Sequence, residues 1–148
     1  MLGATLEATT RLSIKPIFIA PKEYSEIKKI LVPYDGSENA SKALYLAAFF
    51  ASEMKLPLIK FNLYDSEEDG KRYLEEAREY LEPYDIPQIQ EKIVDGEPSD
   101  KIVEVAKESG ANLIVMGSYG HSRIREAILG SVTVQTMRKS TCPLLMAR

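Results

Sequence analysis

The sequence predicts an α/β fold in which a parallel sheet carries helices on both faces. Short apolar runs bounded by turn residues alternate five times, from residue 28 onward, with segments whose apolar residues recur at helical spacing. Right-handed crossovers between parallel strands place the connecting helices on both faces of the sheet. A chain of 148 residues is long enough to form one domain with its own core.

The first predicted strand and helix follow each other directly. The apolar run 30–34 ends in a turn at Asp35-Gly36-Ser37, where Asp35 or Ser37 can cap the next helix. That helix extends to about residue 54, and its apolar stripe is rich in alanine, which permits close packing on a sheet. The second strand is 58–64, and a second helix begins within 65–68.

The remaining elements are set by strand patterning and by helix start and stop signals. The segment 88–94 has a poor strand pattern, which indicates an edge strand. Pro98 suits the first position of a third helix, and Gly110 suits its end. A fourth strand follows, then a helix from about Ser131 and a last strand from 143 to 147.

A glycine-rich stretch, 116–133, follows the apolar strand 113–116. Gly117 and Gly120 stand where this strand ends, and Gly130 precedes the predicted last helix. Glycine allows the backbone to approach a ligand closely, and a helix N-terminus attracts anions. The strand end and the helix start can therefore close on one phosphate chain. The alternative is that these glycines only form tight turns.

Three loops are expected to meet at one crevice. In parallel α/β sheets, ligands bind outside the carboxyl ends of the strands, at the point where the strand order changes direction. The segments 35–37, 64–65 and 116–117 all fall at predicted carboxyl ends.

Composition and charge narrow the function classes. The formal net charge is −3 and no basic block occurs, which argues against nucleic acid as the main partner. No apolar run of 18 residues and no secretory signal pattern is present, so the sequence predicts no membrane span and a cytoplasmic location. A single cysteine, Cys142, cannot form an internal disulfide, which suits a reducing compartment.

The N-terminal region repeats the C-terminal one. Residues 2–20 align without gaps on 129–147, and leucine, glycine, threonine, arginine, serine, proline and alanine recur at matching places. Chance similarity of two amphipathic segments is the alternative explanation. We interpret 1–27 as an extension that resembles the last helix and strand of a preceding copy plus a linker, followed by a complete domain at 28–148.

On the basis of these residues, the chain resembles the universal stress protein family from Lys28 to Arg148. The run 30–37 is similar to the first strand and turn of the family. The spacing Gly117, two residues, Gly120, nine residues, Gly130 and then Ser131 is similar to the form found in its ATP-binding branch. The resemblance implies a Rossmann-like, adenine nucleotide α-hydrolase-like fold whose five parallel strands have the order 3-2-1-4-5.

The resemblance also implies an adenine-nucleotide site. Pro33 and Asp35 would line the adenosine side, and Leu63 would offer backbone groups to adenine. Tyr34 stands where the family often has a small aliphatic residue, which implies a narrower or stacked adenine side. The residues implied for ribose and phosphates are Met116, Gly117, Gly120, Gly130, Ser131, Val132 and Thr133.

The resemblance implies that the chain is a cytoplasmic, ATP-binding stress-response protein. Mg²⁺ or Mn²⁺ could bind together with the phosphates. Asp35 is the only carboxylate that the sequence places near the site, so we expect a sensor or regulator rather than a fast enzyme. The alternative is a dimerisation module without nucleotide. An α-hydrolase would need a Ser-Gly-Gly-x-Asp-Ser loop after the first strand, and a Walker loop needs Gly-Lys-Ser or Gly-Lys-Thr; neither occurs.

The strand of the N-terminal extension is expected to pair with the last strand of a domain. In the family the last strand commonly pairs with that of a second copy. We therefore predict that Pro16–Ala20 pairs antiparallel with Pro143–Ala147, either within one chain or exchanged between two chains as a homodimer.

Overall fold

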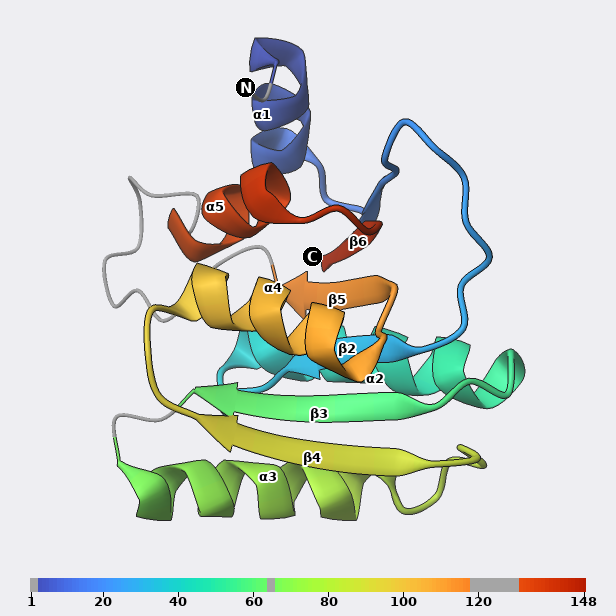
Figure 1. The fold of residues 1–148 in the computed structure, drawn as a ribbon, viewed down its shortest axis with the longest axis vertical. Helices are drawn as coiled ribbons and strands as arrows, with labels where there is room; N and C mark the ends of the chain where they lie inside the picture. Colours follow the sequence, from blue (N-terminus) through green and yellow to red (C-terminus); the bar gives the residue numbers. More distant parts are fainter. Residues whose placement is uncertain (1–2, 64–65, 118–130) are drawn as a thin grey trace.

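The computed structural model describes residues 3–63, 66–117 and 131–148 and shows one sheet between layers of helices (Figure 1). The alternation of strands and helices predicted from residue 28 onward is confirmed. The described elements, in chain order, are α1 (Ala4–Leu12), β1 (Ile17–Ile19), β2 (Ile30–Pro33), α2 (Glu38–Glu53), β3 (Leu58–Leu63), α3 (Glu67–Leu81), β4 (Ile89–Val94), α4 (Pro98–Ser109), β5 (Leu113–Gly117), α5 (Ser131–Lys139) and β6 (Leu144–Ala147).

The strand order is β1-β6-β5-β2-β3-β4. The five strands from β2 to β6 are parallel, and their order is the predicted 3-2-1-4-5. β4 lies at an edge, also as predicted. β1 adds a sixth described strand at the opposite edge, antiparallel to β6, so the sheet is wider than the five-stranded sheet predicted for the domain.

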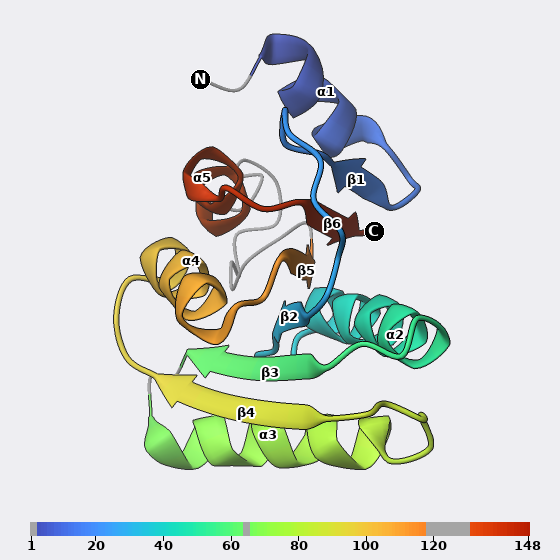
Figure 2. The same cartoon turned by 45° about the vertical axis from the view of Figure 1, so that its right-hand side comes forward.

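β1 pairs with β6 of the same chain. Ile17 lies opposite Met146, Phe18 opposite Leu145 and Ile19 opposite Leu144. Of the two arrangements predicted for the terminal strands, the structure has the one within a single chain. The segment 20–29, exposed along most of its length, then carries the chain from β1 to the start of β2 (Figure 2).

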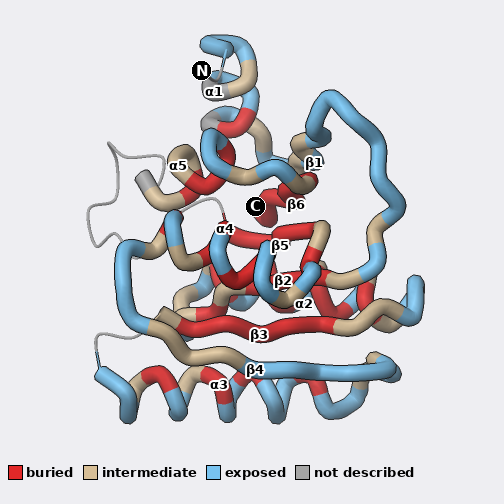
Figure 3. Tube along the Cα trace, viewed as in Figure 1, coloured by how far each residue is buried: buried red, intermediate tan, exposed pale blue. Residues whose placement is uncertain are grey.

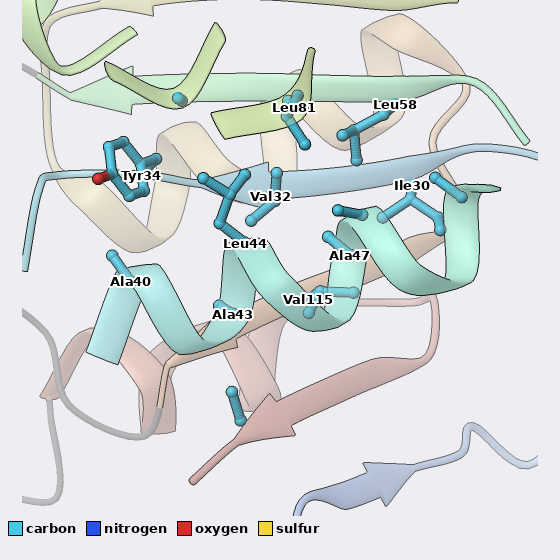
Figure 4. Packing of buried hydrophobic residues seen from close by; sticks show 14 of the residues in the cluster. Ile30, Val32, Tyr34, Ala40, Ala43, Leu44, Ala47, Leu58, Leu81 and Val115 are labelled. Carbon is cyan, nitrogen blue, oxygen red and sulfur yellow. The ribbon is translucent and has the colours of Figure 1, made fainter. Parts of the chain in front are cut away.

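One face of the sheet is covered by α2 and α3. Ala43, Ala47 and Ala51 of α2 are completely buried, and Figure 4 shows this alanine side of the helix facing Ile30 and Val32 of β2. Methyl side chains let the helix axis come close to the sheet, which is the packing that the alanine stripe predicts.

The opposite face is covered by α4 and α5, as Figure 2 shows. Ile102 of α4 and Met137 of α5 join Leu31 and Ile114 of the sheet in the second core cluster. The central strands are buried along their length, whereas β4 is exposed or half-buried (Figure 3). The poor pattern of β4 therefore follows from its place at the sheet edge.

The structure shows how the residues that the sequence analysis placed at helix starts and ends act there. The Ser37 hydroxyl caps α2 by accepting a hydrogen bond from the Ala40 amide (3.1 Å), and Ser66 caps α3 in the same way through the Asp69 amide (3.2 Å). Gly110 ends α4 with a φ of 72°, the left-handed conformation expected at this position. Within the described ranges, none of the helices combines the length and the apolar character that a membrane crossing needs.

Replacing a buried alanine of α2 tests this packing. Ala47→Leu adds volume where no space exists, and we expect the free energy of unfolding to fall by about 1–3 kcal/mol. Glu53→Leu, at an exposed position of the same helix, is the matched control and should change it by less than about 0.5 kcal/mol. Urea unfolding measures both, and equal effects would contradict the close packing of α2.

Candidate functional site

A cavity of about 100 Å³ opens at the carboxyl ends of β2, β3 and β5. The strand order changes direction here, because β3 lies on one side of β2 and β5 on the other. The described residues that line the cavity are Pro33, Tyr34, Asp35, Ser37, Ala40, Phe61, Leu63, Pro98, Ile102, Met116, Gly117 and Val132.

The cavity brings together residues that the sequence analysis took from three different loops. Six predicted site residues line it: Pro33, Asp35, Leu63, Met116, Gly117 and Val132. Gly120 and Gly130 lie outside the described residues. Ser131 begins α5, but its side chain also lies outside them.

Thr133 is also a predicted site residue, but it is not among the residues that line the cavity. Its side chain is fully buried, and its hydroxyl donates a hydrogen bond to the carbonyl oxygen of Gly117 (3.2 Å). This bond ties the first turn of α5 to the end of β5. The hydroxyl therefore holds the helix start in place, and it does not line the described cavity.

Only glycine fits at position 117, because the backbone of Asn39 lies too close for a side chain. A Cβ atom built on it would lie 2.7 Å from the carbonyl oxygen of Asn39 and 2.9 Å from the Cβ of Asn39. The start of α2 thus approaches the end of β5 more closely than any side chain allows. The sequence singled out this glycine as a ligand-binding position, and the structure shows that it also lets two elements meet.

The turn after β2 is fixed by its own polar groups. The Asp35 carboxylate accepts a hydrogen bond from the Ser37 amide (2.9 Å), which shapes the turn before α2. Gly36 has a φ of 76° and faces the ring of Tyr73. Asn62, buried on β3, donates to the carbonyl oxygen of Tyr34 (2.7 Å) and so holds the end of β2 against its neighbour.

The helices beside the cavity are joined by charged groups. The Lys139 ammonium at the end of α5 donates to the Asp100 carboxylate (2.7 Å) and to the buried Ser99 hydroxyl (2.8 Å) at the start of α4. The hydrogen bond with Asp100 raises the pKa of Lys139. The amide of Asp100 and the hydroxyl of Ser99 lower the pKa of Glu97. These contacts fix the α4 turn that carries Pro98 into the cavity wall.

Several lining residues were not recognised from the sequence. Phe61 lies two positions before Leu63 on the same strand, so the alternation of strand faces would have found it. Pro98 and Ile102 are four positions apart on α4, which puts them on one helical face. Tyr34, by contrast, was expected on the adenine side and does line the cavity; its additional place in the core under α2 is what the sequence did not reveal.

The fold and the site define an α/β domain of the adenine nucleotide α-hydrolase-like class, with its crevice at the switch point of the sheet. The model of the universal stress protein family matches residues 26–148, and the chain belongs to this family.

Relatives and solved structures agree with this assignment. The universal stress protein Slr1230 of Synechocystis is 32% identical over 149 residues, which cover 99% of this chain and 52% of that protein. The chain thus spans about half the length of this relative. The structure of the MJ0577 protein of Methanocaldococcus jannaschii has a TM-score of 0.74 at 30% identity and covers 83% of this chain and 96% of that one. A universal stress protein crystallised in complex with cAMP has a TM-score of 0.73 at 30% identity and covers 84% and 98%.

Gly117→Ala tests whether the close approach of α2 and β5 shapes the site. The added methyl group meets backbone atoms that cannot yield without moving α2, so we expect a loss of about 1–3 kcal/mol in the free energy of unfolding. Gly3→Ala, where nothing lies within 4 Å of the new methyl group, is the control. A Gly117→Ala variant as stable as the control in urea unfolding would contradict the proposed constraint.

Proposed function

We propose that this chain binds an adenine nucleotide, ATP in particular, in the switch-point cavity and acts in the cytoplasm as a stress-response sensor or regulator. The observation that carries the proposal is the convergence of Pro33, Asp35, Leu63, Met116, Gly117 and Val132 on one cavity beside the start of α5. The relative crystallised with cAMP supports an adenine nucleotide as the class of ligand.

The chemistry of the lining matches the parts of a nucleotide. Phe61, Leu63 and Ile102 give an apolar wall for a planar base. Val132 places the first turn of α5 at the same cavity, and the unpaired amides of a helix start attract phosphate oxygens. Gly120, Gly130 and Ser131 are proposed to complete the phosphate contacts.

A divalent cation would depend mainly on the nucleotide. Among the described residues, no group of three histidine, cysteine or acidic side chains is placed to hold a metal ion. Asp35 is the acidic residue among the described lining residues. We therefore propose that Mg²⁺ or Mn²⁺ arrives with ATP, bound chiefly by phosphate oxygens.

The described lining residues favour binding of the nucleotide over its hydrolysis. One oxygen of the Asp35 carboxylate already accepts the Ser37 amide, and hydrolysis needs a base that can take a proton from water. We propose that the nucleotide acts through its occupancy of the site.

We also propose a homodimer in which β1 is exchanged. The register of Ile17 with Met146 can form equally between two chains if the segment 20–29 extends away from its own domain. Multi-angle light scattering should then give twice the chain mass at high protein concentration. A strictly monomeric chain over the whole concentration range would contradict the exchange.

A charge placed at the start of α5 tests the nucleotide site. Val132→Asp puts a negative charge into the cavity wall, and we expect the affinity for ATP to fall about tenfold or more. Val132→Asn has the same shape without the charge and is the matched control. An acidic residue in the first helical turn is favourable, so the Asp variant should be at least as stable as the Asn variant.

Isothermal titration with ATP and Mg²⁺ distinguishes the outcomes. Binding by the Asn variant and about tenfold weaker binding by the Asp variant support the site. Equal affinities would place the phosphates elsewhere. No binding by the unaltered chain would favour the interaction module without nucleotide.

A further inference from the structure

The pairing of β1 with β6 has a local twofold symmetry. Each residue n of 2–20 aligns with residue n + 127 near the C-terminus, so Phe18 is equivalent to Leu145. These two residues also lie directly opposite each other in the sheet. The axis therefore passes between Phe18 and Leu145 and relates β1 to β6.

The symmetry extends to the helices and to their hydrogen bonds. α1 and α5 begin and end at equivalent positions, four and twelve in one and 131 and 139 in the other. Equivalent threonine and serine side chains also make equivalent hydrogen bonds, the first pair within the helices and the second in the turns before the strands. The matching bonds are Thr9 Oγ1 to Thr5 O (2.8 Å) with Thr136 Oγ1 to Val132 O (2.7 Å), and Lys15 N to Ser13 Oγ (3.1 Å) with Cys142 N to Ser140 Oγ (3.2 Å).

The surroundings of the two units differ. Leu145 is 8% exposed, because α2 covers it and because β5 pairs with β6 on the side away from β1. Phe18 is 51% exposed, and in the described part of the sheet no strand pairs with the outer edge of β1. Phe18 also lines a groove of about 430 Å³, which the segment 20–27 forms together with Met54, Leu56 and Pro143. The unit formed by α1 and β1 thus lacks the cover that α5 and β6 have.

We propose that the α1–β1 unit is a docking surface for a second domain body of the universal stress type, one that lacks its own last helix and strand. The twofold axis places a strand of the β5 type beside the free edge of β1 and a helix of the α2 type over Phe18. The partner must be incomplete, because in a complete domain the edge of the β5-type strand is already taken by its own last strand.

Two further observations favour this occupant. Among the described strands none pairs with the outer edge of β1, and an exchange of β1 between two chains would leave that edge unpaired as well. The Synechocystis relative matches 99% of this chain, the extension included, within a protein about twice as long. A body that precedes an α1–β1 unit is therefore compatible with the family. The inference does not depend on nucleotide binding.

The test adds such a body to the intact protein. A second copy of residues 28–128 is joined in front of residue 2, where the internal alignment continues it. If the added body docks, hydrogen exchange of residues 16–20 should slow at least about tenfold relative to the unfused chain, since the free edge becomes paired. Light scattering should show a compact monomer. Unchanged exchange at 16–20 would overturn the proposal.

Matched variants separate docking from loss of fold. Phe18→Lys should leave the unfused chain stable, because the side chain is half exposed, and should abolish the added protection in the fusion. Ile14→Lys is the control, because Ile14 is 90% exposed and its equivalent, Thr141, is exposed as well. Equal effects of the two variants in the fusion would overturn the proposal.

Discussion

The close approach of α2 to the end of β5 at Gly117 is the contact on which the rest of the site depends. The backbone of Asn39 occupies the space that a side chain at residue 117 would fill. The alanine face of α2 allows the same closeness along the rest of the helix. Because Thr133 binds the carbonyl oxygen of Gly117, the start of α5 is held to the same point. Three elements therefore meet at one corner, and the cavity opens beside it.

This corner explains how one cavity combines apolar walls with polar ends. Phe61 and Leu63 of β3 pack in the core cluster that includes Ile102 of α4, whereas Asp35 and Ser37 belong to the turn that starts α2. The Lys139 ammonium joins the end of α5 to the start of α4, the helix that carries Pro98 into the cavity wall. The base and the phosphates of the proposed nucleotide would therefore meet different surroundings within one site. That division supports the proposed nucleotide more than the size of the cavity does.

The sequence predicted the strand order, the edge position of β4 and the residues of three converging loops, because these follow from periodicity, turn residues and resemblance. The resemblance placed Thr133 among the residues implied for ribose and phosphates, whereas the structure gives its hydroxyl a carbonyl partner 16 residues away in the chain. The sequence did not anticipate the bond between Lys139 and Asp100, which spans 39 residues. Contacts of this kind depend on how helices lie over the sheet, and no local pattern encodes them. The extension was predicted to pair with the last strand, and the observed register adds the twofold symmetry between the two units.

The most direct test of the central claim is to denature the purified protein and to identify any released nucleotide by chromatography. The account predicts that ATP, or another adenine nucleotide, is released in a fixed ratio to the chain, or that the nucleotide-free protein binds added ATP in the presence of Mg²⁺ or Mn²⁺. Neither released nucleotide nor binding of added ATP would contradict it. The cavity at the carboxyl ends of the strands would then be a feature of packing, and the surface formed by the terminal strands would be the main functional one.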